Sequence, residues 1–144
     1  MAECLATTAP WALLPLRLVV GILFIMHGWP KLFGPHRPQV VGFFRQVGIP
    51  FPAVGAFLSG IGEFGAGLLL LIGLLVPIAG FLPLINMLVA TYVSVVKLNK
   101  PLLAIEKPGY EYDLVLIAVA LAFMLFGAGR FSLDALLGLW RWGV

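Results

Sequence analysis

Charged residues are scarce in this chain of 144 residues: they make up 10% of it, whereas hydrophobic residues make up 62%. A soluble domain carries about 25% charged residues, so this composition excludes a soluble globular protein and indicates a multi-pass protein of the cell membrane. The formal net charge is only +3, and no basic stripe with interleaved aromatic residues occurs. We therefore expect lipid headgroups, and no nucleic acid, around the basic residues.

Cysteine and histidine are scarce too. The single cysteine, Cys4, allows neither an intrachain disulfide nor a dithiol pair. The two histidines, His27 and His36, are not accompanied by a cluster of carboxylates, so the sequence predicts no metal site and no bis-histidine haem site. We also find no Ser-His-Asp arrangement and no phosphate-binding motif. The sequence predicts no catalytic residue, and whether the chain is an enzyme stays open.

Four long apolar runs predict an all-α fold, a polytopic membrane protein built as an antiparallel bundle of four transmembrane helices. We expect one domain, residues 1–144, with spans over approximately residues 11–33, 52–75, 78–96 and 112–128. The first span has no basic segment before it and is expected to be retained rather than cleaved. Pro77 is expected to end the second span, so that spans two and three form a tight hairpin.

The connections between the spans are short or amphipathic. Residues 34–51 predict a short helix at the membrane interface, and residues 132–142 predict an amphipathic C-terminal helix with Ser132 as its N-cap. Most basic residues flank the side of the two long loops, which the positive-inside rule places in the cytoplasm. These residues are Lys31, Arg37, Arg45, Lys97, Lys100 and Lys107.

Glu63 lies near the middle of the second apolar run. A lone carboxylate at that depth costs about 2.5–3.5 kcal/mol on insertion, so it is expected to face the protein interior. Small residues at helical spacing share its face, which favours close packing against another helix. We expect Arg17 to pair with Glu63, with Asn86 as a third partner. The alternative is that Arg17 extends to the nearby interface.

Together the polar residues of the spans predict a buried seam that binds a ligand or carries protons; the alternative is a clasp that only fixes helix register. Its members are Arg17, His27, Lys31, Glu63, Asn86 and Glu111, with Ala118 and Ala122 expected to face it. In this seam His27 either bonds a quinone carbonyl or relays a proton; otherwise it is a helix-end histidine bonded to a neighbour. Tyr110 and Tyr112 are interpreted as interface anchors.

Four segments resemble the DoxX family of small bacterial membrane proteins. They are the run from Arg17 to Gly34 with its His27-Gly28-x-x-Lys31-Leu32-Phe33-Gly34 core, Glu63 in a glycine-rich span, Gly109-Tyr-Glu-Tyr-Asp113, and Gly129-Arg-Phe-Ser-Leu-Asp134. The resemblance implies a four-helix membrane bundle. It also implies an association with membrane redox systems: quinone-linked sulfur oxidation, quinol oxidase assemblies, and complexes with superoxide- or thiol-handling enzymes.

Three functions follow as hypotheses. The first is a non-catalytic or quinone-contacting membrane subunit of an oxidoreductase or redox-stress assembly. The second is a non-catalytic scaffold or assembly factor that docks soluble enzymes. The third is a small transporter, which needs a homo-oligomer because four spans enclose too little space for a pore. The expected partners are therefore the lipid bilayer, membrane or peripheral redox proteins, and further copies of the chain.

Overall fold

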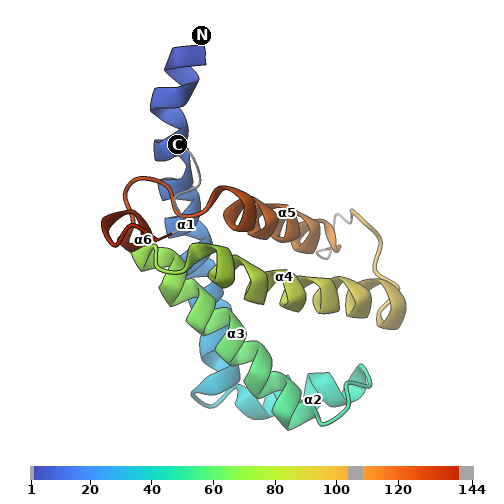
Figure 1. The fold of residues 1–144 in the computed structure, drawn as a ribbon. Helices are drawn as coiled ribbons and strands as arrows, with labels where there is room; N and C mark the ends of the chain where they lie inside the picture. The colour runs from blue at the N-terminus through green and yellow to red at the C-terminus, as the bar shows by residue number, and fades with distance from the viewer. Residues whose placement is uncertain (1, 104–108, 140–144) are drawn as a thin grey trace.

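The computed structural model describes residues 2–103 and 109–139, with the backbone alone for residues 2–10. The described part is all-α (Figure 1). Three stretches are long and apolar enough to cross a membrane: Trp11–Leu32, Pro52–Ile72 and Val76–Lys97. A fourth apolar helix, α5 (Glu111–Phe126), is shorter, with 16 residues. The protein is therefore a multi-pass helical membrane protein.

The remaining elements are α1 (Ala2–Leu32), α2 (Arg37–Gln46), α3 (Pro52–Ile72), α4 (Val76–Tyr92), the π-helix η1 (Val93–Lys97) and α6 (Leu133–Leu136). The expected spans agree with α1, α3, α4 with η1, and α5 to within a few residues, except that α1 begins earlier, at Ala2. The short helix expected within residues 34–51 is α2.

Two predicted boundaries are wrong. Pro77 does not end the second span: Gly73 ends α3 in a left-handed conformation, φ 69°, and Pro77 lies in the first turn of α4, where its missing N–H costs nothing. The C-terminal helix predicted over residues 132–142 ends at Leu136, and Gly138 has a positive φ of 65°. Residues 140–142 lie outside the described part. Ser132 does cap α6, since its Oγ accepts from the amide of Ala135 at 3.1 Å.

The long helices form two antiparallel pairs. In the first pair, α1 and α3 touch through glycines: a Cβ at Gly67 would lie 2.7 Å from the carbonyl oxygen of Gly21, and a Cβ at Gly28 would lie 2.5 Å from the amide of Phe64. In the second pair, α4 and α5 meet at Gly80, where a Cβ would lie 2.9 Å from the carbonyl oxygen of Ala120. Small residues thus let the backbones approach closely, as expected for the Glu63 face.

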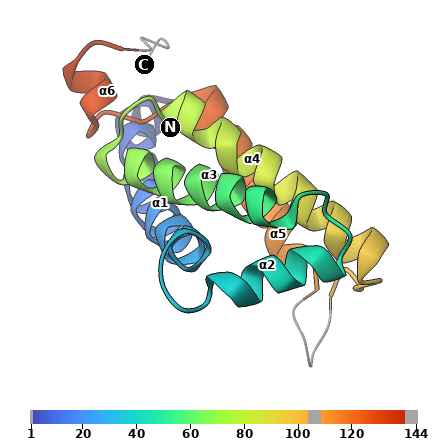
Figure 2. The same cartoon turned by 90° about the horizontal axis from the view of Figure 1, so that it is seen from below.

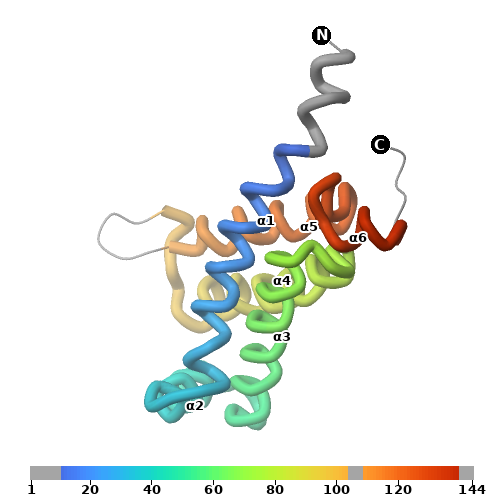
Figure 3. Tube along the Cα trace, turned by 90° about the vertical axis from the view of Figure 1, so that its left-hand side faces the viewer, coloured from blue at the N-terminus to red at the C-terminus, as the bar shows by residue number. Residues whose placement is uncertain are grey.

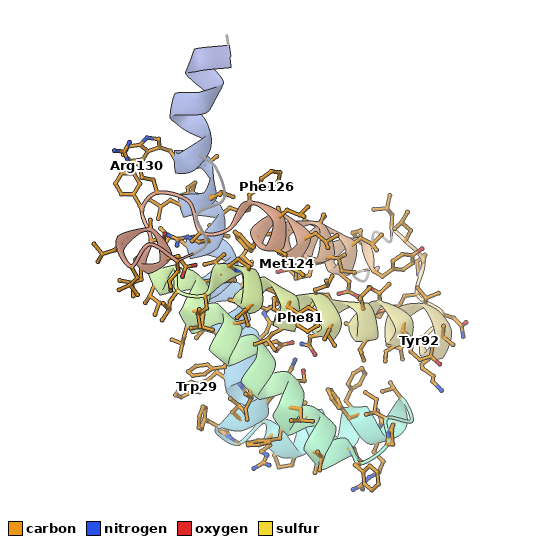
Figure 4. All side chains as sticks on the ribbon, viewed as in Figure 1. Trp29, Phe81, Tyr92, Met124, Phe126 and Arg130 are labelled. Carbon is orange, nitrogen blue, oxygen red and sulfur yellow. The ribbon has the colours of Figure 1, made fainter. Side chains whose placement is uncertain are left out.

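The helix axes of the two pairs are not aligned with one another. The pair of α4 and α5 runs across the pair of α1 and α3, and the pairs join at the turn between α3 and α4 (Figures 1 and 3). At the opposite, open end, α2 lies across the structure below α3 (Figure 2). Where an antiparallel bundle of four helices was predicted, the structure has two crossed antiparallel pairs, which together form a wedge. Large apolar side chains such as Trp29 and Phe126 cover its outer faces, as a lipid-facing surface requires (Figure 4).

Asp134 holds the joint of the wedge together. The start of α4 has no side-chain cap of its own. Instead, the carboxylate of Asp134 accepts hydrogen bonds from the amides of Leu75 at 2.7 Å and Val76 at 2.9 Å. The amide of Asp134 in turn donates to the carbonyl oxygen of Gly73 at 2.9 Å. A charged cap from the C-terminal segment therefore satisfies backbone donors that would otherwise be buried without partners.

We predict that Asp134→Ala lowers the free energy of unfolding by about 2–4 kcal/mol, because each buried donor left without a partner costs about 1–3 kcal/mol. Thermal unfolding of the purified protein in detergent measures the loss. Leu136→Ala is the matched control, since Leu136 belongs to the same short helix and is 79% exposed. Equal melting temperatures for the two variants would contradict the capping role.

Candidate functional site

Glu63 is buried at the middle of α3, with 2% of its surface exposed. The face of α3 that carries it is buried along its length, as the small residues on that face predicted. Its Oε1 accepts two charge-assisted hydrogen bonds: the Lys31 ammonium lies 2.5 Å away, and the side-chain amide of Asn86 donates to the same oxygen. Lys31 also donates to Ser59 Oγ at 3.0 Å. One residue from α1, two from α3 and one from α4 thus form a polar group, which we call the Glu63 group.

Lys31 reaches Glu63 because of the way α1 packs on α3. A Cβ at Gly60 would lie 2.9 Å from the Cβ of Lys31, so the last turn of α1 lies about one turn of α3 away from Glu63. The glycine leaves room for the lysine stem to run along α3. A lysine at a helix end usually extends toward water. Here the buried carboxylate gives it a partner, and the ammonium turns inward instead.

The predicted pair of Arg17 and Glu63 is wrong. Arg17 lies at the other end of α1, next to Gly73, and its Nη2 donates to the carbonyl oxygen of Phe131 at 2.6 Å. The glycine contacts fix the register in which Gly21 faces Gly67. The Arg17 guanidinium therefore reaches Gly73, ten residues after Glu63, which is nearly three turns or ~15 Å along the helix axis. Its 1% exposure also excludes an extension to the interface.

Of the other predicted site residues, one contacts Glu63 and the rest lie elsewhere. Asn86 joins Glu63 as expected. His27 is exposed, and its Nδ1 lies 2.8 Å from the carbonyl oxygen of Leu23 in the same helix, which matches the helix-end interpretation. Glu111 lies at the start of α5, away from Glu63. Ala118 is exposed rather than facing the seam, because the buried face of α5 consists of Leu116, Ala120 and Phe123. The structure thus brings together three of the six predicted residues: Lys31, Glu63 and Asn86.

A cavity of about 750 Å³ extends from the Glu63 group between α2, α3 and α4 to the start of α5. Its size lies within the range of small-molecule sites, about 300–1,000 Å³. Most of its lining is apolar, including Phe43, Phe44, Leu58, Leu82, Ile85 and Val89. Apart from Gln39 on α2, its polar side chains occur at two places: the Glu63 group at one end, and Ser94, Lys100 and Asp113 at the other.

The sequence analysis did not assign this second polar place to a site. Ser94 follows Asn86 by two turns, and Asp113 lies in the tyrosine-rich entry to the fourth span. These sequence positions gave a weak indication that both residues belong to a polar site. Their contact with each other follows from the antiparallel pairing of α4 with α5, but their place in one cavity with Glu63 depends on the crossing of the helix pairs, which helical periodicity does not reveal. Among the described residues, no group of three or more His, Cys, Asp and Glu side chains gathers in a way that could hold a metal ion.

We predict that the pair of Lys31 and Glu63 is coupled in stability. Lys31→Met leaves a buried carboxylate without its cation and should cost about 3–5 kcal/mol, whereas the double variant Lys31→Met/Glu63→Gln should cost clearly less. Melting temperatures of the four proteins of this double-mutant cycle test the coupling. Lys97→Met, at an exposed lysine, is the control and should leave the melting temperature unchanged. Additive losses in the double variant would show that the two charges do not interact.

Comparisons with known proteins agree with this architecture. The chain is 32% identical over 133 residues to "Uncharacterized membrane protein Rv3486" of Mycobacterium tuberculosis, covering 87% of this chain and 80% of that protein. It is 29% identical over 119 residues to "Putative oxidoreductase CatD" of Bacillus subtilis, covering 83% of this chain and 81% of that protein. No solved structure matches the chain. The DoxX family model matches residues 12–95, which include α3, α4 and the whole Glu63 group. The chain therefore belongs to the DoxX family of membrane proteins.

Proposed function

We propose that the chain is the quinone-binding membrane subunit of an oxidoreductase assembly, and that the quinone headgroup binds in the cavity beside the Glu63 group. The observation that carries this proposal is the cavity itself, in which the compact Glu63 group adjoins a mostly apolar lining. A quinone likewise has a polar part and an apolar part: its ring carries two carbonyl oxygens, and an apolar tail is attached to the ring.

The polar end offers both hydrogen-bond donors and acceptors. Lys31 has three N–H groups, of which Ser59 and Glu63 accept two, so one remains for a carbonyl oxygen. Asn86 uses one N–H toward Glu63 and keeps a second N–H and its carbonyl oxygen. This mixture suits the carbonyls of a quinone and the hydroxyls of the corresponding quinol. Half-buried Asn86 faces the cavity, whereas Glu63 is almost completely covered.

In this proposal, a partner protein exchanges electrons with the bound quinone. The single cysteine cannot supply a dithiol pair, and the protein's own contribution in this proposal is to hold and orient the headgroup. The Bacillus subtilis relative carries the word oxidoreductase in its name, which supports a place in a redox system. The scaffold hypothesis differs from this proposal in one respect: it requires no quinone in the cavity.

We predict that Asn86→Leu lowers quinone affinity by about tenfold, because one hydrogen bond to the headgroup is worth about 1.4 kcal/mol. The experiment compares tritiated quinone binding to the full chain in lipid nanodiscs. Thr91→Leu is the matched control: Thr91 lies on α4 outside the cavity and donates only to the Met87 carbonyl oxygen, at 2.8 Å.

The two variants should keep the melting temperature of the wild type within a few degrees. If neither the wild type nor its native complex binds quinone, and Asn86→Leu supports growth under redox stress as well as Thr91→Leu does, the scaffold hypothesis replaces this proposal.

A further inference from the structure

The cavity lining extends from the Glu63 group toward the side of the structure that carries α2. Glu63 lies near mid-length of α3, whereas Ser94, Lys100 and Asp113 lie at the ends of helices, close to the side that carries α2. Asn86 and Ser94 are eight residues apart on α4 and η1, a rise of ~12 Å. The cavity therefore runs from the membrane interior toward one surface.

The outer end of the cavity is a second polar group. Ser94 is 7% exposed, and its Oγ donates to Oδ2 of Asp113 at 3.4 Å. The charges that act on Asp113 are those of Lys100 and Glu111. Lys100 also lines the cavity, and its backbone amide donates to the carbonyl oxygen of Ser94 at 2.9 Å. The π-helix η1 makes this turn, and π-helical turns occur frequently at functional sites.

Toward the opposite face, the structure is closed by packed apolar side chains. Beyond Glu63 lies the hydrophobic core, in which Leu70, Val76, Ala79 and Phe123 have no exposed surface. Among the described residues on this side, buried polar groups, Arg17 and Asp134, recur only at the joint between α3 and α4. Water chains need polar partners and room, and the apolar side chains between Glu63 and that joint offer neither. The cavity offers both, since 750 Å³ far exceeds the ~30 Å³ that one water molecule occupies.

We propose that this cavity is a one-sided proton path in which Asp113 passes protons between the membrane face carrying α2 and the Glu63 group. A proton moves from the surface to a carboxylate oxygen of Asp113, through water in the cavity, and to Glu63; release follows the same route backward. No bond other than O–H bonds forms or breaks, and no electron moves. Glu63 is suited to receive the proton because its Oε2 is buried without a hydrogen-bond partner in the described part of the chain.

This inference deepens the proposed function, because protons taken up or released by a quinone at the Glu63 group would then exchange with one face alone. By the positive-inside prediction that face is the cytoplasmic one. The path does not need a bound quinone, so its failure is distinguishable from failure of the proposed function.

Thiol labelling tests the access route. In a Cys4→Ser background, Ala90→Cys places a thiol in the cavity lining, and Ala118→Cys places one on an exposed face of α5 outside the cavity. A membrane-impermeant maleimide should label Ala90→Cys in vesicles of one orientation only and should label Ala118→Cys in neither. Labelling of Ala90→Cys from both sides, or from neither side, would overturn a one-sided path.

Infrared spectroscopy tests the role of Asp113. After a pH jump in quinone-free proteoliposomes of the full chain, the carboxyl band that Glu63→Gln abolishes should respond about tenfold or more slowly in Asp113→Asn. Asp113→Glu should restore the rate, and Arg130→Gln, at an exposed residue outside the cavity lining, should not change it. An unchanged rate in Asp113→Asn would remove Asp113 from the path, and with it this inference. A normal pH response in protein that binds no quinone would leave the path standing and refute only the proposed function.

Discussion

The contact between the glycine faces of α1 and α3 is the constraint on which the rest of the structure depends. With Gly21 against Gly67 and Gly28 against Phe64, neither helix can slide without a collision between backbone atoms. This register decides which cation meets the buried carboxylate. Lys31 arrives within reach of Glu63, and Arg17 is carried to the other end of the helix pair. Packing of uncharged residues thus determines the electrostatics of the site.

The second determinant is the joint between the helix pairs. The sharp turn from α3 to α4 leaves the first amides of α4 without partners in their own helix. The carboxylate of Asp134, near the far end of the sequence, accepts their hydrogen bonds. Arg17 adds a hydrogen bond between α1 and the C-terminal segment, since its guanidinium donates to the carbonyl oxygen of Phe131. With one end of the wedge fixed in this way, the other end opens and leaves the cavity beside Glu63.

Hydrophobic runs of bilayer length were enough to predict the helices, and the small residues around Glu63 were enough to predict its burial. Its contact with Asn86 was predicted from the central position of Asn86 in the third span. The partner of Glu63 was not predictable in the same way, because depth along separate helices says nothing about their register. The crossing of the pairs, and with it the place of Ser94 and Asp113 in the same cavity as Glu63, depends on contacts between distant parts of the chain. The C-terminal helix was overestimated because its apolar spacing continues past Gly138, whose positive φ helical geometry does not allow.

Gly73 has a consequence for how this sequence can diverge. Its left-handed conformation already disfavours other residues, and the space that a Cβ would need is occupied by the guanidinium of Arg17. The Cβ of Ser132 also lies 2.6 Å from that point, so a larger residue at position 73 requires both a shorter side chain at position 17 and a displacement of Ser132. Substitution at position 73 is therefore coupled to residues 17 and 132, from the two ends of the chain, and sequence drift at this glycine is constrained by both.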